Sequence, residues 1–197
     1  MTGKIVIISG PSGSGKTTLY RKLLLSPRLK GKLVKIVSVT TRLKRPGEIA
    51  GRDYIFETKE NFFHQKRAGF FLESKKVFEN YYGTPKKSVE KILRKGQNVL
   101  LCIDVQGART VSKKYPQAIK IFIDVPTIEI LKKRLEKRAS ESRVSLDIRL
   151  QTSRKERQEA RRYHYVIIND DLAKAYKKLE SKVAQALKTR EHKSDAC

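Results

Sequence analysis

The fold of this chain is decided by one stretch near its start, Gly10-Pro11-Ser12-Gly13-Ser14-Gly15-Lys16-Thr17. It follows the apolar run Ile5-Val6-Ile7-Ile8, which is typical of a buried strand, and precedes a segment of helical character. A strand, a glycine-rich loop and a helix in this order are the setting of a phosphate-binding P-loop. Glycines let the backbone turn so that successive N–H groups face one concavity, and the positive end of the helix dipole adds to the attraction. The pattern therefore predicts a nucleotide-phosphate site rather than an ordinary turn.

Two side chains of this motif carry chemistry of their own. Lys16 is expected to reach the β- and γ-phosphates of a bound nucleotide, and the Thr17 hydroxyl is expected to ligate Mg²⁺. The same loop serves many proteins that bind nucleotide phosphates. It therefore predicts the kind of ligand and leaves the reaction open.

The composition indicates one α/β domain with a strongly basic surface. The 197 residues include 45 Lys and Arg against 20 Asp and Glu, a formal net charge of +25. Such a charge favours nucleotides, nucleic acid or acidic surfaces without choosing among them, and a solvated basic coat explains it equally well. No long apolar stretch predicts a membrane span, and the two cysteines, Cys102 and Cys197, do not suggest a disulfide framework. We therefore expect a cytoplasmic protein without a membrane partner.

Strand-like runs alternate with helical segments along most of the chain. Apolar runs typical of buried strands occupy residues 5–8, 33–37, 98–104, 118–124 and 165–169. This alternation predicts an α/β fold of three αβα layers, in which helices cover both faces of a mostly parallel core sheet. Ligands bind such sheets at the carboxyl ends of the strands. We expect the residues that follow the strand-like runs to share one rim: Gly10, Thr40, Asp104, Pro126 and Asn169.

Two segments depart from this alternation. Residues 38–86 carry polar motifs, aromatic residues and turns, among them Asn80-Tyr81-Tyr82-Gly83, which indicates an inserted subdomain. Short strands are predicted at Tyr54-Ile55-Phe56 and Phe70-Phe71-Leu72-Glu73. Residues 137–162 are polar and basic, and they are predicted to form a mobile helical excursion.

The inserted segment also carries residues suited to a purine monophosphate. Arg42 and Arg45, followed by Tyr54, can converge on a dianionic phosphate through guanidinium and phenol hydrogen bonds. The Glu73 carboxylate can accept the paired N–H groups of guanine, whereas adenine presents a different donor pattern. Taken singly, each of these residues could also be an ordinary solvated surface charge.

Together these stretches closely resemble the guanylate kinases. The resemblance runs from Lys4 to about Lys182 and includes the P-loop and the stretches 38–54, 80–84, 103–107 and 168–172. It implies an enzyme of purine nucleotide metabolism that transfers the γ-phosphoryl group of ATP to GMP with Mg²⁺, giving ADP and GDP. It also implies three parts: a core of residues 1–37, 87–125 and 156–197, a GMP-binding subdomain of residues 38–86, and a lid of residues 126–155.

The same resemblance assigns roles to single residues. The guanine base is read by Ser38, Glu73 and Thr84, with Asp104 beside them. The phosphate of GMP is held by Arg42, Arg45, Tyr54 and Tyr82. ATP is bound by the P-loop residues quoted above, by Thr18, and by Asn169 near the adenine. The residues that act on the transferring phosphoryl group are Lys16 and three lid arginines, Arg134, Arg138 and Arg149.

Two features of the sequence allow more than one interpretation. Spacing alone does not decide whether Tyr81 or Tyr82 faces the ligand, and the lid arginines could form a solvated helix face. Where the family usually has an acidic residue two positions before Asp104, this chain has Cys102, which could slightly shift the electrostatics around Mg²⁺ or the substrate. The family also commonly has Asp or a similar residue where His164 stands, and neither departure is expected to remove activity.

Two other functional classes are alternatives to the kinase. A related module that binds phosphorylated peptides typically lacks parts of the P-loop or of the GMP site, whereas both sets are present here. Nucleic-acid binding driven by the net charge is expected only as a weak, salt-sensitive side effect without a dedicated site. The sequence leaves a monomer and a homodimer equally open.

Overall fold

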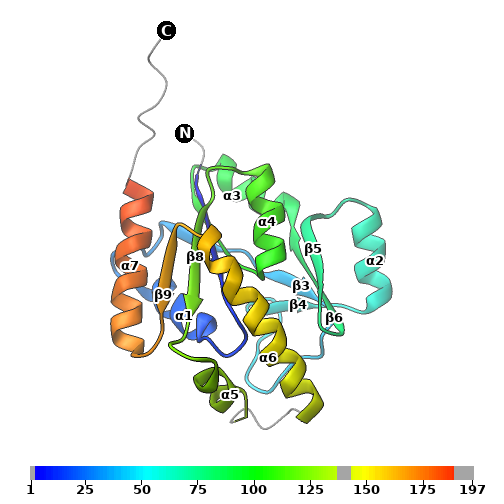
Figure 1. Ribbon diagram of the computed structural model, residues 1–197. Helices are drawn as coiled ribbons and strands as arrows, with labels where there is room; N and C mark the ends of the chain where they lie inside the picture. The colour runs from blue at the N-terminus through cyan, green and yellow to red at the C-terminus, as the bar shows by residue number, and fades with distance from the viewer. Residues whose placement is uncertain (1–2, 137–142, 189–197) are drawn as a thin grey trace. The chain divides into compact units, whose positions relative to one another are not determined.

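The computed structural model describes residues 3–136 and 143–188, and it confirms an α/β fold with a mostly parallel core sheet (Figure 1). The chain divides into two compact units, each assembled from two separate stretches. Unit 1 comprises Met1–Ser9 and Lys32–Ala118, and unit 2 comprises Gly10–Gly31 and Ile119–Cys197. The predicted division into core, GMP-binding subdomain and lid stays a prediction. Arg138 and Cys197 lie outside the described residues.

Unit 1 contains three parallel strands, β1 (Ile5–Ser9), β2 (Leu33–Lys35) and β7 (Asn98–Cys102). Strand β7 pairs with both of the others, placing Val99 opposite Ile5 and Asn98 opposite Leu33. Every residue of β1 is buried, as expected for a β-branched strand covered on both faces. Two helices complete this part of the unit, α3 (Lys86–Arg94) and α4 (Val105–Lys114).

A second, four-stranded sheet in unit 1 has the order β4-β3-β6-β5. Its strands are β3 (Ser38–Thr40), β4 (Tyr54–Phe56), β5 (Phe71–Val77) and β6 (Asn80–Pro85). Helix α2 (Lys59–Arg67) lies beside β5 and β6 in Figure 1, and the ring of its Phe62 stacks on Phe71 at a centroid distance of 4.7 Å.

Two sequence-based expectations are wrong in this sheet. Thr40 ends a strand of the four-stranded sheet, so it does not share a rim with the residues that follow β1 and β7. The stretch read as a turn at residues 80–83 belongs to strand β6, because the chain reverses two residues earlier. There Val77 pairs with Asn80 across a tight turn in which Phe78 has φ 54°, and a phenylalanine gives no sequence signal for such a turn.

Unit 2 combines two parallel strands with the helix that follows the P-loop. The strands are β8 (Ile119–Asp124) and β9 (Tyr165–Ile168), and the helix is α1 (Lys16–Leu25). Helix α7 (Leu172–Lys188) runs alongside β9 in Figure 1 and packs against α1. The Ser26 hydroxyl, just after α1, donates to the carboxylate of Glu180 on α7. The P-loop helix is thereby anchored at its far end.

The remaining helices of unit 2 are α5 (Ile128–Glu136), α6 (Arg143–Gln158) and the 3-10 turn η1 (Glu159–Arg162). They confirm the helical part of the excursion predicted over residues 137–162, of which residues 137–142 are not described. Leu131 and Leu135 of α5 are fully buried and give the helix its inner face.

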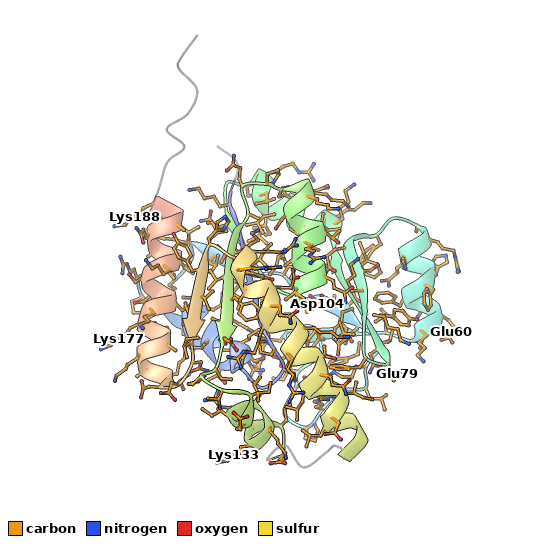
Figure 2. All side chains as sticks on the ribbon, viewed as in Figure 1. Glu60, Glu79, Asp104, Lys133, Lys177 and Lys188 are labelled. Atoms are coloured by element: carbon orange, nitrogen blue, oxygen red, sulfur yellow. The ribbon has the colours of Figure 1, made fainter. Side chains whose placement is uncertain are left out.

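The described surface is rich in lysine. Figure 2 shows Lys177 and Lys188 pointing outward from α7, and both side chains are exposed. Within residues 3–136 and 143–188, no helix has the length and apolar character needed to cross a membrane.

Candidate active site

The P-loop has the backbone conformation that its glycines predict. Gly10, Gly13 and Gly15 have φ values of 142°, 87° and 88°, which L side chains rarely adopt. A Cβ atom on Gly10 would lie 2.0 Å from the backbone oxygen of Ile123, so that position admits glycine alone. The Ser14 N–H donates to the carbonyl oxygen of Pro11 at 3.1 Å and closes the loop on itself. Gly15 then caps the start of α1.

Lys16 lies back over its own loop. Its Nζ donates to the carbonyl oxygens of Gly10 at 2.5 Å and of Pro11 at 2.8 Å. An ammonium group fixed over the loop in this way is placed to meet phosphate oxygens bound by the loop N–H groups. Thr17 and Thr18 follow in the first turn of α1, and both are exposed.

Asn169 is packed against the P-loop from the end of strand β9. Its side chain is buried, and its Nδ2 donates to the carbonyl oxygen of Ser14 at 2.8 Å. A Cβ on Gly15 would come within 2.2 Å of that nitrogen, so the two residues interlock. The expected adenine-side residue is therefore in contact with the phosphate loop itself.

Two of the predicted lid arginines also belong to this region. Arg134 on α5 donates from Nη2 to the backbone oxygen of Asn169 at 3.0 Å. Arg149 on α6 directs Nη1 to the Ser12 hydroxyl of the P-loop at 3.5 Å, the outer limit of a hydrogen bond. Both side chains are half-buried. Unit 2 therefore gathers cationic side chains from two helices around the P-loop.

A further arginine on α6 was not singled out in the sequence. Arg157 donates from Nε to Asp124 Oδ2 at 2.9 Å and from Nη2 to the backbone oxygens of Val125 and Pro126 at 3.2 and 3.3 Å. Asp124 is buried, and its Oδ1 accepts the Val125 N–H at 2.8 Å. This pair fastens the carboxyl-terminal part of α6 to the end of strand β8.

In unit 1, Arg42 is held by an acidic partner. Its Nη2 lies 2.8 and 3.0 Å from the two carboxylate oxygens of Glu48, and its Nη1 donates to the Leu43 carbonyl at 2.6 Å. Burial by itself lowers the pKa of the guanidinium, but the Glu48 hydrogen bond and the Tyr82 phenol outweigh it and raise the pKa of Arg42 above its ordinary value. Burial raises the pKa of Glu48, yet Arg42 and the backbone N–H of Arg45 more than reverse this, so that the carboxylate stays ionised near neutral pH.

The aromatic residues expected at the phosphate lie around this pair. The Arg42 guanidinium is 5.4 Å from the centroid of the Tyr54 ring and 5.8 Å from that of Phe56. The Tyr54 and Tyr82 rings meet edge to face at 5.9 Å. The ring of Tyr81 instead contacts Phe63 at 4.8 Å, in the aromatic packing under α2. The neighbouring tyrosines of β6 thus take different surroundings, and Tyr82 is the one beside Arg42.

Arg45 and Ser38 are two further residues that the sequence predicts for the GMP site. The Arg45 side chain is exposed, while its backbone N–H donates to Glu48 Oε2 at 2.9 Å across the turn that contains Gly47. Ser38 begins β3 and pairs with Tyr54 of β4. We call Arg42, Arg45, Tyr54 and Tyr82 the phosphate cluster.

A buried carboxylate marks the other part of unit 1. Glu73 on β5 is 6% exposed and accepts a 2.6 Å hydrogen bond from the Thr84 hydroxyl on β6. Burial is the largest influence on its pKa, and it outweighs the opposing Thr84 hydrogen bond. The negative charge of Asp104 acts in the same direction as burial, and the pKa of Glu73 is raised to about 7.

Asp104 stands at the start of α4, where Figure 2 labels it. Its Oδ1 accepts the N–H groups of Gln106 and Gly107 at 2.7 and 3.0 Å, so it caps the helix. A Cβ at Gly107 would come within 2.8 Å of Glu73 Oε2, so this glycine leaves room for the buried carboxylate. We call the residues that the family resemblance assigns to guanine, Ser38, Glu73, Thr84 and Asp104, the base cluster.

Comparison with known proteins settles the family. The family model described as guanylate kinase matches residues 2–186. The chain belongs to the guanylate kinase family.

Individual guanylate kinases agree over nearly the whole chain. The chain is 42% identical to the guanylate kinase of Rickettsia felis over 177 residues, which cover 90% of this chain and 91% of that protein. It is 44% identical to the guanylate kinase of Clostridium perfringens, with 91% and 82% covered. The crystal structure of guanylate kinase from Anaplasma phagocytophilum superposes with a TM-score of 0.79 at 32% identity, covering 96% of this chain and 88% of that one.

The two departures from the guanylate kinase pattern have separate structural settings. Cys102 ends strand β7 as a half-buried thiol. His164 accepts the Lys120 N–H at its Nδ1 over 3.0 Å, which joins the start of β9 to β8. Burial, followed by the charge of Lys120, lowers the pKa of His164, so the imidazole is neutral near neutral pH and suited to this acceptor role.

Several residues of the site escaped sequence reasoning. Glu48 had a signal, because the run Arg45-Pro46-Gly47-Glu48 is a turn pattern that brings an acidic side chain back toward Arg42. Gly107 and the pair Asp124 and Arg157 had none, because each depends on a partner from a distant part of the chain.

Proposed function

We propose that the two units divide the work of one reaction, in which the γ-phosphoryl group of ATP passes to GMP to give ADP and GDP. The chain is on this account an ATP:GMP phosphotransferase. The observation that carries the assignment is the buried pair of Glu73 and Thr84. Sites for phosphate are common to many enzymes, whereas a buried carboxylate beside a hydroxyl is suited to a base that offers two adjacent N–H donors.

On the donor side, we assign ATP to residues 10–18 and Asn169 of unit 2. The positive φ angles of the loop glycines support this, since they turn backbone N–H groups toward one concavity. The contacts of Lys16 with the loop carbonyls support a position for its charge at the β- and γ-phosphates. Arg134 and Arg149 are assigned to the transferring phosphoryl group on the basis of their contacts around the loop. Arg138 keeps the same assignment as a prediction from the sequence.

On the acceptor side, we assign the GMP phosphate to the phosphate cluster and the guanine to the base cluster. The guanidinium of Arg42 is held in a fixed orientation by Glu48 and by the Leu43 carbonyl, and Arg45 is exposed and able to approach from the turn. Thr84 and Glu73 offer a hydroxyl and a carboxylate to the edge of the base. Asp104 lies near Glu73, because its Oδ1 accepts the N–H of Gly107 and Gly107 packs against the Glu73 carboxylate.

We assign a Mg²⁺ ion to Thr17, to be carried in with ATP. Within residues 3–136 and 143–188, no group of three or more His, Cys, Asp or Glu residues could hold a metal ion by itself. The exposed Thr17 hydroxyl is a hard oxygen donor, and Mg²⁺ commonly takes one or two protein oxygens with substrate phosphates and water, so the residues present fit the ion. Bound there, the ion would neutralise charge on the β- and γ-phosphates.

The chemistry asks for positioning and charge compensation. A phosphate oxygen of GMP forms the new bond to the γ-phosphorus as the bond to the β-phosphate oxygen breaks, and ADP leaves. Because the attacking oxygen is already anionic, the step needs no general base. What it needs is compensation for two polyanions brought together, and Lys16 with the arginines of the two helices supplies it.

A panel of nucleoside monophosphates tests the proposal. ADP release is measured with ATP, Mg²⁺ and either GMP, AMP, CMP or UMP as acceptor. We expect kcat/KM for GMP to exceed that of each other acceptor by about a hundredfold or more, because the others leave the buried carboxylate without its paired donors. A preference for another acceptor, or ADP release independent of any acceptor, would contradict the assignment.

We further propose a cytoplasmic location and a monomeric or homodimeric state. The low cysteine content, two in 197 residues, suits a reducing compartment. Light scattering on the purified chain measures the mass directly. A species larger than a dimer would contradict the second part of this proposal.

A further inference from the structure

Asn169 makes three hydrogen bonds around the P-loop, each with a different atom. Its Nδ2 donates to the Ser14 carbonyl at 2.8 Å, its backbone N–H donates to the Asp124 carbonyl at 2.7 Å, and its backbone oxygen accepts from Arg134 Nη2 at 3.0 Å. The residue is 4% exposed. A side chain so enclosed has a fixed orientation, and that orientation acts on the peptide bond between Ser14 and Gly15.

The direction of that peptide bond decides what the loop offers to a ligand. In a planar trans peptide the C=O and the following N–H point to opposite sides. Because the amide of Asn169 holds the Ser14 carbonyl, the N–H of Gly15 is turned away from Asn169. Gly15 has φ 88° and no Cβ, so little else in its own covalent structure would oppose rotation of this peptide.

We infer that Asn169 is a positioning residue, which fixes the Ser14–Gly15 peptide so that its N–H serves the polyphosphate of ATP. The inference rests on the proposed binding of ATP at the P-loop. Through Arg134 the same residue is joined to helix α5, and through Asp124 it is joined to the end of strand β8. The loop is thus held by a neutral amide, which leaves the positive potential of the loop undiminished.

The packing of Gly15 against Asn169 supports this assignment independently of the hydrogen bond. A Cβ at position 15 would lie 2.2 Å from Asn169 Nδ2, well inside any real contact. The side chain of Asn169 therefore occupies the space on that face of the loop. A brace of this kind acts on every ligand that uses the loop N–H groups, whereas a contact to adenine acts only on nucleotides that carry the base.

The experiment compares a polyphosphate that carries adenine with one that does not. Asn169→Ala removes the amide, and Asn169→Leu keeps roughly its branched shape while donating no hydrogen bond. Calorimetry on each full-length variant measures affinity for ATP, for inorganic tripolyphosphate and for GMP. Asp170→Asn is the matched control, because Asp170 is adjacent and exposed. Unchanged GMP affinity, at the sites assigned to unit 1, reports that the variant is folded.

We expect both Asn169 variants to lose about tenfold in affinity for ATP and for tripolyphosphate alike, with GMP affinity and the control within about twofold of the wild type. A loss confined to ATP, with tripolyphosphate bound as tightly as before, would overturn the inference in favour of an adenine contact. Unchanged affinity for both would overturn it as well. Failure of the wild-type chain to bind either polyphosphate would instead count against the proposed function.

Discussion

The two candidate anion sites of this protein are built in opposite ways. The P-loop of unit 2 is assembled from backbone: three glycines at positive φ, a lysine bonded to loop carbonyls, and a neutral amide as its brace. The phosphate cluster of unit 1 is assembled from side chains, and its main guanidinium is braced by a carboxylate, Glu48. The P-loop depends on the conformation of the backbone, whereas the phosphate cluster depends on charged side chains held in fixed positions.

The difference teaches how each site sets its affinity. Backbone N–H groups carry partial charges and do not titrate, so on the proposed function we expect the P-loop to bind polyphosphate over a wide pH range. The carboxylate of Glu48 lies beside the cations of the phosphate cluster, so it fixes the orientation of Arg42 and also reduces the net positive charge there. On the proposed function, the fixed guanidinium of Arg42 presents a definite geometry to the phosphate of GMP.

The largest effect is expected from a substitution in the backbone-built site, the P-loop. Lys16→Ala removes the charge that lies over the loop, and we expect kcat to fall by about a thousandfold because the developing charge on the phosphates loses its compensation. Coupled ADP-release kinetics measure the loss, and far-UV circular dichroism confirms the fold. Lys22→Ala, an exposed lysine of the same helix, is the control. A Lys16 variant that retains a tenth of the wild-type kcat would refute the role given to this residue.

The next effect breaks the side-chain-built site. Arg42→Ala should raise KM for GMP by about a hundredfold, since it removes a guanidinium held in a fixed orientation and also leaves Glu48 without its main partner. KM for ATP should change by less than about twofold. The exposed Lys44 offers the matched control, as Lys44→Ala removes one positive charge from the same loop. An equal effect of the two substitutions would mean that general charge, and not fixed geometry, binds the phosphate.

A third substitution tests whether an arginine of helix α6 acts in the transfer step. Arg149→Ala should lower kcat by about thirtyfold with little change in KM for GMP, because its guanidinium approaches the loop at Ser12. Arg154→Ala, on an exposed position of the same helix, should leave kcat within about twofold. Steady-state kinetics with both substrates varied separate the two parameters. A change in KM for GMP alone would place Arg149 outside the transfer step.

The smallest expected effect concerns pH and the base cluster. On the proposed function, guanine binding requires ionised Glu73, and burial raises the pKa of this carboxyl from 4.5 to about 7. The ionised fraction therefore falls as pH drops below about 7, and KM for GMP should rise roughly tenfold between pH 8 and pH 6. The phosphate of GMP titrates in the same pH range. Glu73→Gln therefore serves as the reference, because it retains the titration of the GMP phosphate and lacks the titration of the carboxyl at position 73. Parallel pH profiles for the two proteins would contradict a role for Glu73 ionisation.

The sequence was informative where function depends on local backbone geometry. Glycine spacing predicted the P-loop, and apolar runs predicted the strands on either side of it, because both signals lie within a few consecutive residues. The buried contact of Glu73 with Thr84 joins positions 11 residues apart on paired strands. Its chemistry was suggested by residue type, but its placement came only from the family resemblance.

The parts that escaped prediction depend on long-range partners. The four-stranded sheet of unit 1 was only partly recognised, because its β5–β6 turn uses Phe78 where a glycine or asparagine would have signalled it. The bracing contact of Asn169 with Ser14 spans 155 positions, and that of Arg157 with Asp124 spans 33. No local sequence pattern indicates such pairs. The first depends on where strand β9 ends relative to the P-loop, and the second on where strand β8 ends relative to helix α6.

The most direct test of the central claim, that two separate sites serve the two substrates, is calorimetric titration of Lys16→Ala and Arg42→Ala, each with ATP and with GMP. We predict that Lys16→Ala weakens ATP at least tenfold and leaves GMP affinity unchanged, while Arg42→Ala does the reverse. If either substitution weakened both ligands by the same factor, the two sites would not be separate, and the account would be wrong.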